Sequence, residues 1–312
     1  MNICEYMRKE SINNLFKMNS FASVWPTWKL EIESRLNISN PSTIFDLGDN
    51  LSDIFKSTSQ SGRSNSVLSA GGNCWEALVC WYLNLSLIGT RTVVIKQCKA
   101  LVPEPIANSI TVTYDNFKSN TESDLIAITF PDIPVFTDNI STLQDIYLNE
   151  NNIIPILKKN GTFNYQHVIN YLCDLYFDDI KVCVIQCKTN WNDNAQIPML
   201  WDMIYSGQSF SRGVSVGING YGINSENFKY AFVTVPSNKD VYTPDKTAVK
   251  RVRNLSGGNY WGKPTLNDVA KSIKEIITTN FSYGINGGNI RNSIRSNISN
   301  IYTKYNYFNI DL

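Results

Sequence analysis

The sequence KVCVIQCK, from Lys181 to Lys188, decides the fold. Its β-branched and apolar residues predict a buried β-strand. Because side chains alternate between the two faces of a strand, one face of its second half is wholly apolar, whereas the other carries Gln186 and Lys188. A lysine at the end of a core strand, two residues after another polar side chain, is unusual for packing alone. We therefore expect chemistry at this end of the strand.

Strand and helix patterns alternate on both sides of this segment. Further strands are predicted at residues 92–95, 109–114, 124–130 and 230–235. Helices are predicted over most of 1–60, and at 74–88, 141–179 (with a break near Gly161), 195–205 and 266–279. The polar stretches 57–73 and 246–264 predict loops, and Gly71-Gly72-Asn73 predicts the start of the helix that follows. Strands interleaved with helices indicate an α/β layer architecture.

The composition excludes several kinds of catalytic site. The chain has 312 residues, with 28 Lys+Arg, 27 Asp+Glu, seven Cys and a single His, His167. Zinc sites with two His ligands and catalytic His pairs need at least two imidazoles and are therefore excluded. A Ser-His-Asp or Cys-His arrangement needs only one. Any other hydrolytic chemistry has to rest on carboxylates, lysine and a hard metal ion.

The sequence shows no sign of a targeting or membrane segment. The N-terminal stretch MNICEYMRKESINN has no apolar signal region, and no apolar run approaches the ~18 residues of a membrane span. The seven cysteines form no C-x-x-C pair, which indicates reduced thiols used as small core residues. We therefore expect a cytoplasmic protein of bacterial type, without a membrane partner.

Charge is distributed unevenly along the chain. Residues 1–238 carry 17 basic and 22 acidic side chains, whereas residues 239–312 carry 11 basic and 5 acidic ones. A basic C-terminal part attached to an acidic body favours a segment that contacts a polyanion. A solvated surface with uneven charge would give the same counts.

Two carboxylates stand out upstream of the decisive strand. Glu76 lies inside an otherwise apolar predicted helix, where a carboxylate is costly without a partner or a function. Asp124 opens the predicted strand 124–130, directly after a polar loop. Asp132 is a rival for the same role, but Pro134 interrupts any strand that would follow it. We therefore favour Asp124.

In this order, the Glu-bearing helix, the Asp-bearing strand and the Gln-x-Lys strand resemble the PD-(D/E)XK nuclease superfamily. The resemblance implies a restriction-endonuclease-like core, in which a central mixed β-sheet is flanked by helices, with a helical N-terminal part and insertions. It divides a single domain, 1–312, into a helical region 1–69, a catalytic core 70–235 with an insertion 131–179, and a basic DNA-contact region 236–312.

The resemblance also implies roles for individual residues. Glu76, Asp124, Gln186 and Lys188 would be catalytic, and Asp124, Gln186, Glu76 and Cys187 would hold a Mg²⁺ cofactor. The ion would polarise the scissile phosphate and lower the pKa of a bound water, and Lys188 would orient that water or help to deprotonate it. Gln186 departs from the family pattern, which has Asp or Glu there, and is similar to the Gln-x-Lys variant of Mrr-like members.

Two polar segments are candidates for contact with DNA. Residues 189–194, TNWNDN, combine amides that can pair with adenine and a Trp that can stack, although a polar turn can have the same residues. The basic, glycine-containing stretch 246–264 can hold phosphates, and it also fits a solvated basic turn. The candidate DNA-binding residues are Asn190, Trp191, Asn192, Asn194, Arg212, Lys246, Lys250, Arg251, Arg253, Asn259, Tyr260 and Lys263.

Together with the family resemblance, these features predict a type II restriction enzyme, a sequence-specific, Mg²⁺-dependent endonuclease that hydrolyses double-stranded DNA. The family implies a homodimer that matches a palindromic site, and a cognate DNA methyltransferase in the same system. Three alternatives stay open. They are an Mrr-like nuclease that cuts modified DNA, a non-catalytic DNA-binding protein on a degenerate nuclease fold, and a Cys-His hydrolase that uses His167.

Overall fold

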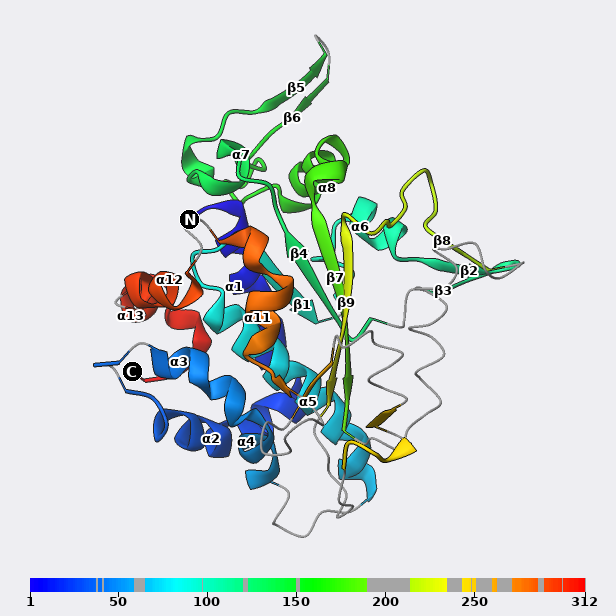
Figure 1. The fold of residues 1–312 in the computed structure, drawn as a ribbon. Coiled ribbons are helices and arrows are strands. Elements are labelled where there is room, and N and C mark those ends of the chain that lie inside the picture. Colours follow the sequence, from blue (N-terminus) through cyan, green and yellow to red (C-terminus); the bar gives the residue numbers. More distant parts are fainter. Residues whose placement is uncertain are drawn as a thin grey trace.

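A mixed β-sheet runs through the middle of the molecule (Figure 1). Within the part of the chain that the structure describes, it has six strands in the order β1-β4-β7-β9-β10-β11. β1, β4 and β7 are antiparallel neighbours, whereas β7, β9, β10 and β11 are parallel neighbours. The strands are β1 (Thr92–Lys96), β4 (Leu125–Thr129), β7 (Lys181–Lys188), β9 (Phe228–Thr234), β10 (Tyr260–Gly262) and β11 (Lys271–Ser272). The expected α/β fold with a central mixed sheet flanked by helices is confirmed.

The structure is a computed structural model of the whole chain. It describes residues 1–37, 39–40, 42–58, 65–96, 98–119, 123–149, 152–189, 214–234, 243–247, 249–250, 260–262, 271–285, 289–298 and 300–311. No helix among these residues combines the length and the apolar character needed to cross a bilayer.

Alternating side chains give the sheet two apolar faces. On one face, residues such as Val94 and Ile185 pack in a cluster with α5 (Asn65–Ser86) and with helices from both ends of the chain. On the other face, residues such as Val93 and Val184 pack in a second cluster, which includes the helix at Tyr165–Leu175. The sheet is therefore covered on both sides, and its strands contribute alternate residues to two cores.

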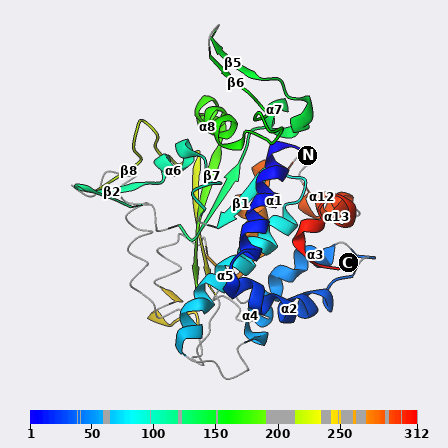
Figure 2. The same ribbon diagram turned by 180° about the vertical axis from the view of Figure 1, so that it is seen from behind.

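Two groups of helices form these covering layers. The layer around α5 contains helices that lie together in Figures 1 and 2. They are α1 (Ile3–Phe16), α2 (Asn19–Glu33), α3 (Ser42–Asp46), α4 (Leu51–Ser57), α11 (Glu275–Asn280), α12 (Ile290–Asn297) and α13 (Asn300–Thr303). The opposite layer contains α6 (Glu104–Ser109), α7 (Pro134–Thr137) and α8 (Tyr165–Leu175), and the first turns of α1 also pack into it through Ile3, Cys4 and Met7. Short 3-10 turns lie at Leu47–Asp49, Ile140–Thr142, Phe177–Asp179, Ser282–Gly284 and Asn306–Phe308.

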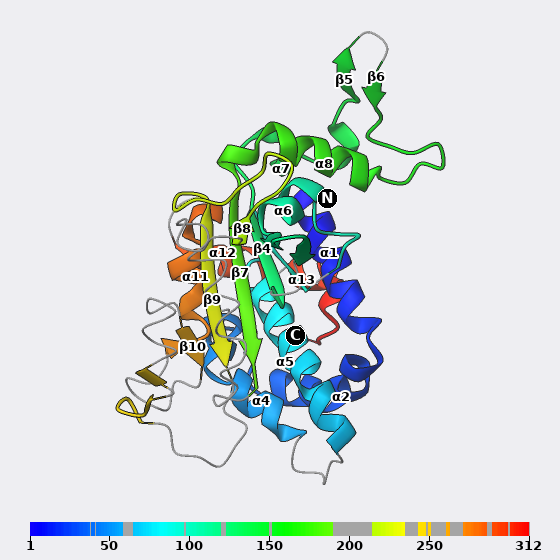
Figure 3. The ribbon, with the colours of Figure 1, turned by 90° about the vertical axis from the view of Figure 1, so that its right-hand side faces the viewer.

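Two smaller sheets extend from this body, one labelled β5 and β6 in Figure 3 and the other labelled β2, β3 and β8 in Figure 1. β5 (Ile146–Asn149) and β6 (Asn152–Ile154) form an antiparallel hairpin that projects away from the rest of the molecule in all three ribbon views. β2 (Val112–Tyr114) lies between β3 (Phe117–Ser119) and β8 (Val214–Val216) in an antiparallel three-stranded sheet.

Side chains from two helices satisfy the outer edge of β1, which is an edge strand of the main sheet. Asn84 of α5 donates from Nδ2 to the carbonyl oxygen of Val94 at 2.7 Å, and its Oδ1 accepts from the Val94 N–H at 3.1 Å. Ser11 of α1 donates to the same carbonyl at 2.8 Å. An open strand edge is a template for unwanted pairing. Here side chains occupy it and fix β1 against α5.

Replacing Asn84 with leucine should lower the free energy of unfolding by about 1–3 kcal/mol, because the buried Val94 N–H loses its acceptor while the Val94 carbonyl keeps Ser11. Urea denaturation followed by circular dichroism measures the change. Asn292→Leu, on the exposed side of α12, is the matched control and should change the value by less than about 0.5 kcal/mol. Equal stability of the two variants would contradict the role given to Asn84.

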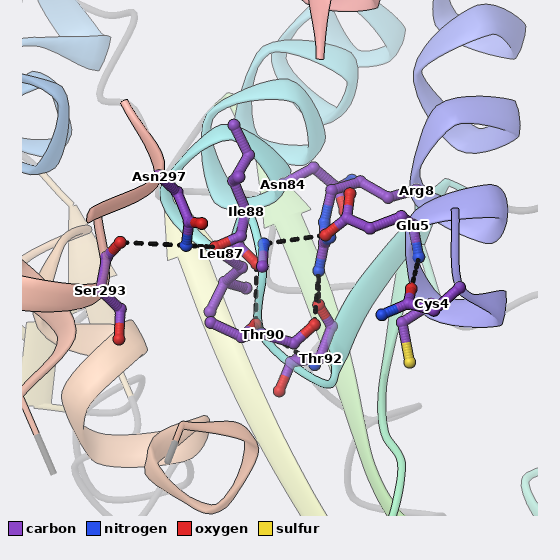
Figure 4. Close-up of polar contacts among 12 residues, drawn as sticks. Cys4, Glu5, Arg8, Asn84, Leu87, Ile88, Thr90, Thr92, Ser293 and Asn297 are labelled. Carbon is purple, nitrogen blue, oxygen red and sulfur yellow. Dashed lines mark hydrogen bonds and ion pairs between the residues drawn. The ribbon is translucent and has the colours of Figure 1, made fainter. Parts of the chain in front are cut away.

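A buried ion pair ties α1 to the turn before β1 (Figure 4). Arg8, with no exposed surface, pairs with Glu5 and donates from Nη2 to the carbonyl oxygens of Thr90 and Thr92 at 3.1 and 2.7 Å. The second carboxylate oxygen of Glu5 accepts from the Tyr307 hydroxyl at 3.0 Å. Burial of the two opposite charges is tolerated here because they pair with each other, and because hydrogen bonds reach both carboxylate oxygens of Glu5 and both terminal nitrogens of Arg8.

Residues 305–311 close the layer around α5. The indole N–H of Trp81 donates to the Phe308 carbonyl at 3.0 Å, and that of Trp25 donates to the Asn309 carbonyl at 3.2 Å. The Phe308 side chain has no exposed surface and stacks edge-on against Trp81. The chain therefore returns at its far end to complete the core around the middle of α5.

Most elements near the decisive strand are confirmed. β7 has the predicted bounds, and the strands predicted at 92–95, 124–130 and 230–235 appear as β1, β4 and β9 with ends shifted by one or two residues. The predicted helices in 1–60 appear as α1 to α4. The apolar helix at 74–88 is the second half of α5. The predicted helix at 195–205 lies outside the described residues.

Two boundaries near α5 and α6 are wrong. The predicted loop at 57–73 ends early, because α5 begins at Asn65 and contains both Gly71 and Gly72. A glycine weakens a helix by only about 1 kcal/mol relative to alanine and keeps its backbone hydrogen bonds, so the helix continues through the pair. The strand predicted at 109–114 is also too long, since α6 runs to Ser109 and β2 begins at Val112.

Three further predictions are wrong because strand pairing decides the local structure. The segment 141–179 is not mainly helical, since β5 and β6 pair with each other, although α8 confirms its later part. The predicted loop at 246–264 contains β10, which pairs with β9. Among the described residues of the predicted helix at 266–279, Lys271 and Ser272 form β11, which pairs with β10, and helix begins only with α11 at Glu275.

Candidate active site

The ends of two neighbouring strands bring Asp124 and Lys188 together. Because β4 and β7 are antiparallel, with Leu125 opposite Ile185, the residue before β4 lies beside the last residues of β7. The Oδ2 atom of Asp124 accepts a hydrogen bond from the Cys187 N–H at 2.7 Å. The same oxygen lies 3.7 Å from Nζ of Lys188. Both residues were predicted from the sequence, and their proximity follows from the strand register.

A second carboxylate-lysine pair lies next to the first. Glu76 projects from α5 and forms an ion pair with Lys96, the last residue of β1. Nζ of Lys96 also donates to Oδ1 of Asn73, one turn earlier in α5, at 3.2 Å. Lys96 was not predicted as a site residue. The signal for it was in the sequence, since Lys96 ends a buried strand just as Lys188 does.

The four charged side chains are largely enclosed and influence one another. Their exposed fractions lie between 12% for Lys188 and 20% for Asp124. Burial raises the pKa of the Glu76 carboxyl, and the neighbouring Asp124 raises it further, while Lys96 and Lys188 act in the opposite direction. Burial likewise raises the pKa of Asp124, against the effects of Lys188, the Cys187 N–H and Lys96. Two carboxylates and two lysines thus form one coupled cluster.

Gln186 and Cys187 complete the end of β7 in different ways. The Gln186 side chain is buried, with a residue exposure of 2%, and follows Val184 on the same face of the strand. Cys187 points the other way, into the apolar cluster around α5. Burial, followed by the nearby Asp124 and Glu76, raises the pKa of the Cys187 thiol well above its ordinary value. Its contact with the cluster is through the backbone N–H that donates to Asp124.

The donor set suits a hard cation. Carboxylate and amide oxygens are the ligands that Mg²⁺ prefers, and Mg²⁺ commonly uses one or two carboxylates while it keeps several waters. Glu76 and Asp124 provide two carboxylates, and the strand register places Gln186, an amide side chain, next to the position of Asp124. Among the described residues, no three His, Cys, Asp or Glu side chains gather as a metal cage. The cluster therefore fits a cation that shares its coordination with water and substrate oxygens.

Comparisons with protein-family models, curated proteins and solved structures found no match to this chain.

The rival acid lies at the wrong end of β4. Asp132 follows the end of the strand at Thr129, whereas Lys188 lies beside its beginning. The Asp132 side chain is more than half exposed and lies 3.7 Å from Nε of Arg91. The structure therefore brings Asp124, not Asp132, to Lys188.

His167 lies away from this cluster. It sits on α8, in the layer on the opposite side of the sheet from α5, and is exposed. Its Nδ1 atom lies 3.2 Å from Oδ1 of Asn164, three residues before it. This environment gives the Cys-His alternative no support.

The predicted DNA-binding residues are only partly placed. Lys246 and Lys250 are exposed and lie on one short turn, where the Lys250 N–H donates to the Lys246 carbonyl at 3.0 Å. Tyr260 begins β10, beside Phe232 of β9. The remaining candidates lie outside the described residues. They are Asn190, Trp191, Asn192, Asn194, Arg212, Arg251, Arg253, Asn259 and Lys263.

Proposed function

We propose that this protein is a sequence-specific, Mg²⁺-dependent endonuclease that hydrolyses double-stranded DNA, of the type II restriction kind, on a PD-(D/E)XK core. One observation carries the proposal. Asp124 and Lys188 meet at the adjacent ends of two antiparallel strands, and the carboxylate of Glu76 from α5 belongs to the same charged cluster. A β-sheet of antiparallel β1, β4 and β7, followed by the parallel β9, carries these residues in the order that the resemblance implies.

The chain's own residues would divide the chemistry as follows. Asp124 and Glu76 would hold the cation, with the Gln186 amide oxygen as a neutral ligand. The bound Mg²⁺ would polarise the scissile phosphate and lower the pKa of a coordinated water. Lys188 would orient that water with its ammonium group and offset the negative charge that develops on the phosphate. Two contacts fix Asp124, and among the described residues both reach Oδ2, so that Oδ1 is left for the cation.

DNA recognition would rest on the segments flanking the cluster. The stretch 189–194 directly follows Lys188, so that side chains reading base edges would begin one residue after the catalytic lysine. The basic stretch 246–264 would hold phosphates. A homodimer acting on a palindrome in the cytoplasm, with a methyltransferase that protects host DNA, is part of the same proposal.

Digestion of phage and plasmid DNA by the full-length protein tests the proposal. With excess MgCl₂, unmodified DNA should yield discrete fragments whose sequenced ends share one motif. Chelation of the Mg²⁺ with EDTA should abolish the fragments. A chain that binds DNA but cuts neither modified nor unmodified DNA under these conditions would contradict the proposal.

One observation favours a second candidate, a non-catalytic DNA-binding protein on the same fold. Gln186 stands where the family has an acid, so the site has one negative charge fewer to hold a cation. The digestion experiment separates the two, because this candidate predicts DNA binding that is independent of Mg²⁺ and leaves the DNA intact. Cutting confined to methylated DNA would instead favour the Mrr-like alternative.

A further inference from the structure

We propose that Lys96 is a positioning residue of this site, which holds the Glu76 carboxylate in place before metal binds and competes with the metal for it. The inference rests on the proposed function, because it assumes that Glu76 and Asp124 bind a divalent cation. It goes beyond that function in assigning Lys96 a role in setting how tightly the cation is held.

The contacts of Lys96 are directed at one carboxylate. Its Nζ atom pairs with Oε2 of Glu76 and donates to Oδ1 of Asn73 at 3.2 Å. Asn73 and Glu76 are three residues apart and therefore share one side of α5. The Lys96 and Glu76 side chains are 13% and 17% exposed, so that water and salt screen their interaction less than at the surface. The ion pair is therefore an enclosed part of the site and not a contact at the surface.

The backbone around Lys96 fixes this pair. Two residues before it, Val94 is bound through both its N–H and its carbonyl to Asn84, which lies on the same helix as Glu76. On the other side of β1, Lys96 is paired with Leu125, the residue after Asp124. Lys96 is therefore held between the helix that carries one carboxylate and the strand that follows the other.

The charges of the cluster show why Lys96 competes with a cation. The charges of two carboxylates and two lysines balance one another. Lys188 forms an ion pair with Asp124, and Lys96 forms one with Glu76. A divalent cation that binds both carboxylates must share Glu76 with Lys96 or displace its ammonium group. Close like charges repel strongly in a partly enclosed site. Removing the Lys96 charge should therefore tighten cation binding, although it leaves the free protein with an unbalanced acidic pair.

Titration of the full-length protein with MgCl₂ alone, followed by isothermal calorimetry and by the shift in Tm, tests the inference without any cleavage assay. Lys96→Met should bind Mg²⁺ at least about tenfold more tightly than the wild type, should have a lower Tm without Mg²⁺, and should gain more in Tm on its addition. Lys96→Arg keeps the charge and should restore behaviour close to wild type. Lys96→Gln serves the same comparison if the methionine variant does not fold.

Lys229→Met is the matched control, because Lys229 is also a strand lysine but donates to the Thr279 carbonyl and not to a carboxylate. It should leave Mg²⁺ affinity unchanged while altering net charge equally. Suppose that the wild type binds Mg²⁺ and that Lys96→Met binds it equally or more weakly. This result would overturn the role of Lys96 but not the proposed metal site. Absence of Mg²⁺ binding in the wild type and in every variant would overturn the proposed metal site and this inference with it.

Discussion

Lys188→Ala and Asp124→Asn are each expected to lower the single-turnover rate of Mg²⁺-dependent DNA cleavage by about 10²–10⁴-fold, the range associated with loss of a positioned acid-base group. Nζ of Lys188 lies 3.7 Å from Oδ2 of Asp124, where it would orient the attacking water. Asp124→Asn keeps the shape of the side chain but removes the charge that would hold the metal. DNA binding, measured by gel shift in the absence of Mg²⁺, should survive in both variants.

The same strand provides the control for this experiment. Lys181 is the first residue of β7 and pairs with Thr129, at the opposite end of the strand from Lys188. Lys181→Ala therefore removes an equal charge from the same strand and should cut at a rate close to wild type. Wild-type cleavage by Lys188→Ala or by Asp124→Asn would remove the basis of the proposed function.

Arg8→Met is expected to have the largest effect on stability, lowering the free energy of unfolding by about 3–5 kcal/mol. The substitution leaves the buried Glu5 carboxylate without its cation, and the carbonyls of Thr90 and Thr92 lose a donor. Glu5 keeps only neutral donors, among them the Gly89 N–H at 2.8 Å. Urea denaturation at constant pH measures the loss.

Two further variants separate burial from charge pairing in this region. The double variant Glu5→Gln/Arg8→Met removes both charges and should recover part of the loss, because an uncompensated buried charge is the main cost. Arg35→Met breaks the i,i+4 pair of Arg35 with Glu31, whose side chains are 31% and 40% exposed. It should cost less than about 1 kcal/mol. Arg8→Met that is no less stable than Arg35→Met would show that the buried pair contributes little.

The sequence predicted an element correctly wherever the burial that shapes the local pattern also shapes the structure. The apolar run of 181–188 is a strand because it is buried on both faces, and β4 and the second half of α5 follow the same logic. Asp124 and Lys188 were grouped in advance because their order along the chain resembles the PD-(D/E)XK pattern. The antiparallel pairing of β4 and β7, which places the start of one strand beside the end of the other, was not predicted and comes from the structure.

The rest depended on packing between distant segments. Lys96 became part of the site only because β1 docks on α5, which brings its ammonium group to Glu76 twenty residues away. β10 and β11 are too short to show a strand pattern, and they become strands because β10 pairs with β9 and β11 pairs with β10. The sequence marked Lys96 as a lysine at the end of a buried strand, but its contact with Glu76 depends on the docking of β1 on α5, which no local pattern contains.

The return of residues 305–311 to α5 has a consequence for the order in which the molecule can fold. The hydrogen bond from Trp81 to Phe308 joins residues 227 positions apart, and the Tyr307 hydroxyl reaches Glu5 across 302 positions. Contacts of such sequence separation form slowly, because the loop between them must close first. During synthesis, α5 therefore emerges long before residues 305–311, which complete the packing around Trp81. We expect the layer around α5 to reach its final packing only late in folding, after residues 305–311 have been synthesised.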